Sequence, residues 1–348
     1  MSRKQLTTLL GYSLIHGVMD FSGIALIWLS SKSHALVGHD ILILTVLYTL
    51  LAFGTQPLFG LLVDKLRVSY ESVLIGVLLM LSAFFLFATP ALVVIFAGLG
   101  SALFHIGAGS MSLDILPQKN TPPGIFSAFG ILGLTSGIVV GTAGVFYYGL
   151  HLALLLLAVV FVLFTPITLS DVETSKKMKN IPHSKLIITL LLIAIAIRAV
   201  YGLGTVFMWE SHTVYFLALA LAVAVGKISG AIFADRYSWL KTIALSVFIA
   251  IPIVVFFANI YLAALVGTFL FSFAFAMPLV ALSNMLAGRK AFVFGLVEFM
   301  ILFQYVGGIS LISQPWLALP LLIFSTVALL LALRLLSPYF KKTLNITN

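Results

Sequence analysis

The sequence contains no cysteine and few charged residues. Of its 348 residues, 10 are acidic and 19 are basic, so that charged residues make up 8% of the chain, whereas 62% of it is hydrophobic. The missing cysteines exclude disulfides and cysteine-ligated metal sites. The shortage of charge excludes a soluble globular protein, because a water-facing surface needs far more polar cover than these residues supply. The composition therefore predicts an integral membrane protein.

Motifs that would indicate an enzyme or a channel are also missing. The chain has no HExxH motif, no second carboxylate near a histidine pair and no phosphate-binding glycine loop. Nothing in it resembles a selectivity filter. We therefore expect neither a channel nor an enzyme, and no cofactor. An intramembrane metalloprotease or lipid transferase remains the minor alternative.

Apolar stretches long enough to cross a membrane follow one another from Leu6 to Leu336. A spanning helix needs about 20 apolar residues. Breaks at charges, prolines and polar clusters divide the chain into twelve predicted helices, at 6–29, 41–63, 72–88, 91–113, 123–147, 151–169, 186–208, 213–234, 240–257, 260–283, 291–312 and 316–336. The first apolar run is too long for a cleavable signal peptide, and no small-residue cleavage site follows it.

A polar stretch at 170–184 lies at the midpoint of the chain. We therefore predict a six-helix half at 1–169, a cytoplasmic linker at 170–184 and a second six-helix half at 185–348.

The basic residues predict the orientation, because cytoplasmic loops retain Lys and Arg. With the amino terminus in the cytoplasm, sixteen of the 19 basic residues fall on the inner side, and Lys32 falls on the outer side. The other two, Arg198 and Lys227, fall within predicted helices. We predict a multi-pass protein of the cell membrane with both termini in the cytoplasm. The net charge of +9 then follows from topology and from attraction to anionic lipid, and requires no nucleic-acid partner.

An acid-base motif occurs once in each half. Residues 60–67 read GLLVDKLR and residues 231–237 read AIFADRY, so that Asp64 and Asp235 lie 171 residues apart. The same offset relates Gly124 to Gly295 and Gly137 to Gly308. Such an internal repeat is typical of secondary transporters. The predicted gate motif consists of Gly60, Asp64, Lys65, Arg67, Asp235 and Arg236.

The first copy of this motif resembles the signature of the major facilitator superfamily, in which a glycine is followed four residues later by Asp and then by a base. The glycine usually found after the base is missing, and Ala231 stands where the first copy has Gly60. The resemblance implies an all-α polytopic membrane protein, with twelve transmembrane helices in two pseudo-symmetric six-helix halves. It also implies that Asp64 meets nearby bases and the amino-terminal end of the predicted helix 291–312, and so latches an inner gate. The alternative is a charge pair that only sets topology.

The fifth predicted helix contains a row of glycines that resembles the antiporter signature of the same superfamily: Gly124, Gly133, Gly137 and Gly141. Ile138 stands where that signature has proline, and Thr142 where it has a glycine. Glycines four residues apart allow close helix packing. We expect this row to pack against the predicted helix 213–234, across the interface of the halves.

Three further strings resemble the fosmidomycin resistance proteins, a branch of the superfamily that exports small toxic molecules in exchange for protons. They are SLIHGVMD at 13–20, QPLFG at 56–60 and GLGSALFH at 98–105. The resemblance implies proton-coupled efflux by an antiporter. The residues of this sequence that match the branch are His16 and Asp20, the dipeptide Gln56-Pro57, and His105.

Few ionisable side chains fall within the predicted helices, and each costs at least about 2.5 to 3.5 kcal/mol there. His16 and Asp20 lie one turn apart and share a helix face. In the superfamily the first, fourth, seventh and tenth helices line a central cavity, which implies that His105 and Arg198 join this face. We predict that Asp20 carries a proton, that the histidines share the relay or bind substrate, and that Arg198 binds a carboxylate or phosphonate.

Alternative roles for these residues remain open. Asp20 could pair with Arg198 or a histidine only to neutralise a buried charge. His16, Asp20 and His105 could also bind a divalent metal as the transported species, although we predict no resident metal. Glu298 and Lys227 are predicted to form a structural salt bridge. We expect a monomer whose partners are a small-molecule substrate, protons and the lipid bilayer.

Overall fold

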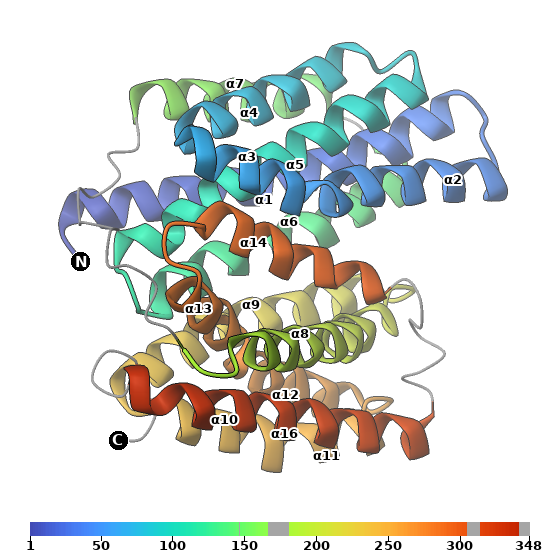
Figure 1. Cartoon of the computed structure of the whole chain (residues 1–348). Coiled ribbons are helices and arrows are strands. Elements are labelled where there is room, and N and C mark those ends of the chain that lie inside the picture. Colours follow the sequence, from blue (N-terminus) through green and yellow to red (C-terminus); the bar gives the residue numbers. More distant parts are fainter. Residues whose placement is uncertain (146, 166–180, 305–313, 341–348) are drawn as a thin grey trace. The chain divides into compact units, whose positions relative to one another are not determined.

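The computed structural model describes residues 1–145, 147–165, 181–304 and 314–340, which form helices and no strand (Figure 1). In this part of the chain, nine helical segments are long and apolar enough to cross a membrane. They are α1 (Arg3–Ser33), α2 (Gly38–Thr49) with η1 (Leu50–Gly54) and α3 (Gln56–Leu66), α5 (Pro90–Ile115), α6 (Thr121–Ala143), α8 (Ser184–Phe207), α9 (Thr213–Arg236), α10 (Trp239–Phe248) with α11 (Ala250–Phe256), α12 (Tyr261–Phe271) with η2 (Ser272–Ala274) and α13 (Ala276–Met285), and α16 (Pro315–Phe340).

Three further helical segments complete the series. The helices α4 (Ser69–Phe85) and α7 (Tyr148–Phe164) are shorter but apolar, and α14 (Lys290–Phe299) continues into η3 (Met300–Phe303). Each of the twelve predicted helices begins within three residues of an observed one. The predicted fold class is confirmed, because backbone groups in lipid must satisfy one another and a long apolar run does this as a helix. The end of the predicted helix 291–312 and most of the predicted linker lie outside the described residues.

Prolines explain three interruptions in the helices. A proline has no N–H, so the carbonyl four residues before it loses its helical donor. Pro57 follows the π-helical turn η1, Pro252 follows the break between α10 and α11, and Pro278 follows the 3-10 turn η2. In each case the affected carbonyl, that of Phe53, Phe248 or Ala274, lies at or next to the interruption.

The chain divides into two compact units. Unit 1 comprises Met1–Ile115, Phe129–Ser170 and Arg289–Phe299; unit 2 comprises Leu116–Ala128, Asp171–Gly288 and Met300–Asn348. Each unit therefore includes a short segment from the other predicted half. In unit 1, α14 packs against α3 and α5 although it comes from the last quarter of the sequence (Figure 1). In unit 2, the segment Leu116–Ala128 contains the first residues of α6, and these contact α9.

Glycines allow α6 to pack closely on α1 within unit 1. A Cβ atom at Gly133 would lie 2.1 Å from the carbonyl oxygen of Gly17, and one at Gly137 would lie 2.7 Å from that of Phe21. A Cβ at Gly141 would lie 2.6 Å from the Cβ of Trp28. Any side chain at these three positions would force the two helices apart.

The predicted partner of the glycine row, α9, is therefore wrong for three of its four members. Within unit 2, Gly124 does face α9, where an added Cβ would lie 2.5 Å from the Cβ of Ala231. The reason is the spacing. Gly124 precedes Gly133 by nine residues, and at 3.6 residues per turn this places it on the opposite face of the helix from Gly133 and well away from Gly137 and Gly141.

Candidate functional site

Three of the four predicted site residues lie together in unit 1. His16 and Asp20 are on α1, and His105 is on α5, which packs against α1. Asp20 Oδ2 lies 3.3 Å from His16 Nε2, and Asp20 Oδ1 lies 3.3 Å from His105 Nε2. Both histidines are buried, and 15% of the Asp20 side chain is exposed. The carboxylate is thus held between two imidazole rings, whose centroids are 4.6 Å apart.

A backbone contact decides where a proton must lie on His105. Its Nδ1 atom is 2.7 Å from the carbonyl oxygen of Ser101, one helical turn earlier. A carbonyl oxygen only accepts, so Nδ1 carries a hydrogen and donates it. If His105 were neutral, its Nε2 atom would then present a lone pair to an ionised Asp20. This arrangement is attractive only when a further proton lies between Nε2 and the carboxylate, whichever atom it is bonded to.

Small and aromatic residues enclose these three side chains. A Cβ atom at Gly130 of α6 would lie 2.5 Å from His16 Nε2 and 2.8 Å from Asp20 Oδ2, so the site depends on a residue without a side chain there. Phe53, in the π-helical turn η1, lies with its ring centroid 6.3 Å from that of His105. A π-helical turn inside an α-helix is frequently found at functional sites.

The same three residues also form a possible metal site. One ligand atom from each of His16, Asp20 and His105 lies within 4.8 Å of the others. Imidazole and carboxylate ligands suit several divalent metals. The bond from His105 Nδ1 to a backbone carbonyl is the second contact that metal-bound histidines usually make, and it leaves Nε2 to act as the ligand. The residues therefore fit a divalent cation as well as a proton.

The fourth predicted residue, Arg198, lies on α8 in unit 2. Its Nη2 atom donates to the hydroxyl of Ser246 at 2.6 Å and to the carbonyl of Phe271 at 2.8 Å. A cavity shared by Arg198 and Asp20 remains a prediction, and so does the salt bridge between Glu298 in unit 1 and Lys227 in unit 2.

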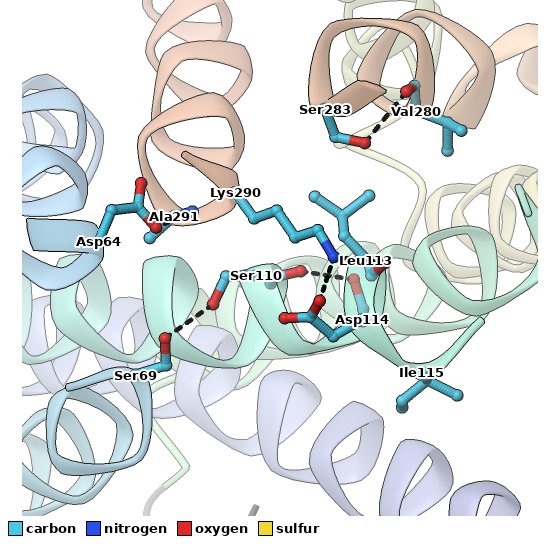
Figure 2. Close-up of polar contacts among 12 residues, drawn as sticks. Asp64, Ser69, Ser110, Leu113, Asp114, Ile115, Val280, Ser283, Lys290 and Ala291 are labelled. Atoms are coloured by element: carbon cyan, nitrogen blue, oxygen red, sulfur yellow. Dashed lines mark hydrogen bonds and ion pairs between the residues drawn. The ribbon is translucent and has the colours of Figure 1, made fainter. Parts of the chain in front are cut away.

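The first gate motif contacts the amino-terminal end of α14, within unit 1. The carboxylate of Asp64 accepts hydrogen bonds from the backbone N–H groups of Ala291 at 3.0 Å and Phe292 at 2.8 Å. Figure 2 shows Asp64 beside Ala291. Helix starts have unpaired N–H groups and a partial positive charge, so a carboxylate is a favourable cap. Gly60 permits this approach, because a Cβ there would lie 2.6 Å from the carbonyl oxygen of Ala291.

The basic residues of the motif do not take part in this contact. Among the described residues neither Lys65 nor Arg67 forms an ion pair with Asp64, and both are exposed. Lys65 points away from the carboxylate because it is the next residue of the helix, and Arg67 ends the helix in a left-handed conformation. The nearby base that acts on Asp64 is Arg289, which directly precedes α14. The ion pair at this place is instead formed by Lys290 of α14 and Asp114 of α5 (Figure 2).

The second gate motif makes the matching contact within unit 2. Asp235, at the end of α9, accepts hydrogen bonds from the backbone N–H groups of Asn120 at 2.9 Å and Thr121 at 2.8 Å, where α6 begins. The side chains of Asn120 and Thr121 donate to the same carboxylate. Its neighbour Arg236 is exposed and lies with its guanidinium carbon 5.7 Å from the ring centroid of Tyr237.

The two contacts obey the offset found in the sequence. Residues 120 and 121 plus 171 are 291 and 292, the two residues that bind Asp64. The glycines match as well, because a Cβ at Gly124 would lie 3.1 Å from the Lys227 carbonyl oxygen, and one at Gly295 would lie 2.7 Å from that of Gln56. The repeat is thus a repeat of three-dimensional contacts.

Comparison of the sequence with protein-family models and with curated proteins finds no match. Comparison of the structure does find similar proteins. A crystal structure of the E. coli fucose:proton symporter FucP matches 96% of this chain and 99% of its own, with a TM-score of 0.67 and 12% sequence identity. A second structure of FucP, described as a major facilitator superfamily transporter in the outward conformation, matches the same shares with a TM-score of 0.68 and 14% identity. The chain has the major facilitator fold.

The major facilitator fold accounts for the helices of the described residues and for the repeat, but residues to which no role was assigned from the sequence complete the Asp20 site and the Asp64 contact. Ser101 sets the protonation of His105, and its position one turn earlier on the same helix was readable from the sequence. Lys290 and Asp114 form an ion pair over a separation of 176 residues, for which the sequence pattern gave no signal.

Proposed function

We propose that this protein is a secondary active transporter that moves a small molecule across the cell membrane by alternating access, coupled to protons. The observation that carries the proposal is the buried group of His16, Asp20 and His105, which requires a proton between Asp20 and His105. Ionisable residues inside a membrane protein commonly form proton relays. The major facilitator fold supports transport, and the resemblance to the fosmidomycin resistance proteins favours export by antiport.

The coupling follows from the hydrogen-bond geometry. With the proton present, a donor and an acceptor face each other between α1 and α5, and the two helices are held together. Without it, the lone pair of His105 Nε2 faces an anionic carboxylate. Loss of the proton therefore favours a rearrangement of α1 against α5, or the binding of a substrate group that donates a hydrogen bond in place of the proton.

A transport assay tests the proposal. The purified protein is placed in liposomes with an acidic interior, and uptake of fosmidomycin is followed together with the internal pH. We expect fosmidomycin to enter while protons leave, and a proton ionophore to abolish the uptake. Uptake that is indifferent to the gradient would contradict proton coupling, and protons moving with the drug would contradict antiport.

Divalent metal transport is the second candidate, because the three ligand atoms lie close enough to share one ion. Calorimetric titration of the purified protein with Zn²⁺ distinguishes it. Binding heat that disappears in a His105→Ala variant would favour metal as the transported species, and the absence of heat would end this alternative.

We also propose that the contacts of Asp64 and Asp235 act as gate latches. In unit 1, replacing Asp64 by Asn keeps a hydrogen-bond acceptor but removes the charge that favours the amino terminus of α14. A charge at a helix terminus contributes up to about 2 kcal/mol, so the open form should become several-fold to about 30-fold more populated.

The native lack of cysteine allows a clean readout of this change. Val63 is buried against Ala291, and a single thiol introduced by Val63→Cys should react slowly with a maleimide. The reaction should accelerate in combination with Asp64→Asn but not with Asp40→Asn, which removes an exposed acid from the start of α2. Equal labelling rates in the two combinations would show that Asp64 does not latch the gate.

A further inference from the structure

Arg198 is held in a fixed orientation by residues of two neighbouring helices in unit 2. Its Nη2 atom donates to Ser246 Oγ of α10 and to the carbonyl of Phe271 in α12, and Ser246 Oγ donates to the same carbonyl at 3.0 Å. The guanidinium carbon lies 4.2 Å from the centroid of the Phe271 ring. A planar cation over an aromatic ring, bonded along one edge, has little freedom to turn.

The carbonyl that anchors Arg198 is available because the helix is interrupted. α12 ends at Phe271, and the chain continues as the 3-10 turn η2, in which Phe275 N–H donates to Ser272. In an unbroken α-helix this N–H would have bonded to Phe271. Interrupted helices that present free backbone groups are a common way to build substrate sites in transporters.

The opposite edge of Arg198 has no partner among the described residues. Its Nη1 atom is buried without a hydrogen bond, and so is the hydroxyl of Tyr201, a residue only 1% exposed. Residues three apart on a helix share one face. Tyr201 belongs to the same apolar cluster as Phe271, over whose ring Arg198 lies. In the described part of the chain Arg198 forms no ion pair, and within unit 2 the carboxylate of Asp235 is bonded to the start of α6.

Arg198 is partly exposed, but its Nη1 atom is buried. A cation without a counter-ion in such surroundings is unfavourable, and two buried donors that lack acceptors add to that cost. An oxyanion removes both problems at once, because it supplies negative charge and several acceptor oxygens. A cationic or purely apolar ligand would leave the guanidinium uncompensated. The arrangement thus selects for charge sign as well as for hydrogen-bonding pattern.

We infer that Arg198 Nη1 and the Tyr201 hydroxyl bind the oxyanion of the transported molecule, which is a small carboxylate or phosphonate. This inference rests on the proposed transport function and names its substrate class. Ser246 and Phe271 are positioning residues that aim the guanidinium. A phosphate headgroup of lipid shares the same chemistry, so the test has to separate a soluble anion from a lipid.

The experiment measures ligand-induced thermal stabilisation of the full-length protein in nanodiscs of zwitterionic lipid. Phenylphosphonate, benzoate and benzylamine serve as probes, since they share one ring and differ in the charged group. Both anions should stabilise the protein and benzylamine should not. Arg198→Ala should abolish the stabilisation, and Tyr201→Phe should weaken anion affinity about tenfold or more, as loss of a hydrogen bond to a charged group does. Tyr215→Phe, which removes the hydroxyl from a half-exposed tyrosine of the same unit, should bind as the unchanged protein does.

Because Arg198→Ala could fail to fold, the inference is judged on the anion affinity of Tyr201→Phe. Anion binding that survives unchanged in Tyr201→Phe, or stabilisation by benzylamine equal to that by the anions, would overturn the inference. Competition by phosphatidylglycerol without any effect of the soluble anions would also overturn it, in favour of a lipid headgroup. Proton-driven transport of a cation that depends on Asp20 would leave the proposed function intact while excluding this substrate class.

Discussion

Asp20→Asn is expected to abolish proton-driven transport. Asparagine has nearly the same shape as aspartate and keeps an oxygen that can accept a hydrogen bond. Its amide group, however, does not bind and release a proton at physiological pH. It would lie between His16 and His105 without the charge that attracts a proton to this site. Uptake of fosmidomycin driven by a proton gradient should fall to the level of protein-free liposomes.

Substrate exchange without a gradient should survive in the same variant, because the fold is unchanged and asparagine keeps an oxygen that can accept a hydrogen bond from the substrate. Asp40→Asn provides the matched control, since it makes the same chemical change at an exposed acid of α2. Full proton coupling in Asp20→Asn would remove Asp20 from its assigned role. Loss of exchange as well as coupling would indicate a structural role instead.

Gly133→Ala should destabilise the protein more than any other substitution of glycine by alanine in α6. The added methyl group would lie 2.1 Å from the carbonyl oxygen of Gly17, which belongs to a helix backbone and cannot turn aside. The two helices would have to separate, and overpacking of this kind costs typically about 1 to 3 kcal/mol, occasionally more. The loss appears as a lower midpoint of thermal unfolding in detergent.

Gly149→Ala is the control for this change. Nothing lies within 4 Å of a Cβ atom at Gly149 in α7, so alanine should leave the midpoint unchanged or raise it through its better helix propensity. If Gly133→Ala and Gly149→Ala unfolded at the same temperature, close packing of α6 on α1 would not be a source of stability.

The helices were predictable because lipid leaves few choices. An apolar run must pair its backbone groups internally, so length and composition decide where α1 to α16 begin. The interruptions were readable only in part. Pro57, Pro252 and Pro278 mark where a helical hydrogen bond is lost. The anchoring of Arg198 beside the interruption η2, however, depends on Ser246 and Phe271 coming together in space.

The candidate site was predictable where one helix contains the whole pattern. His16 and Asp20 share a face by their spacing alone, and the resemblance to the superfamily signature correctly placed Asp64 at the start of α14. The predicted partner of the glycine row was wrong because the sequence alone did not show which face of α6 meets which helix. Contacts such as Lys290 with Asp114 join residues from the two halves of the chain, and no local pattern predicts which of many bases meets a given acid.

The central claim is that the group formed by Asp20 and His105 holds the proton that transport exchanges for substrate. It is tested most directly by adding fosmidomycin to the purified protein in weakly buffered detergent solution and measuring the protons released. By linkage, a substrate that competes with a proton should release about one proton per protein molecule, and the Asp20→Asn variant should release none. Equal proton release by both proteins would contradict the account.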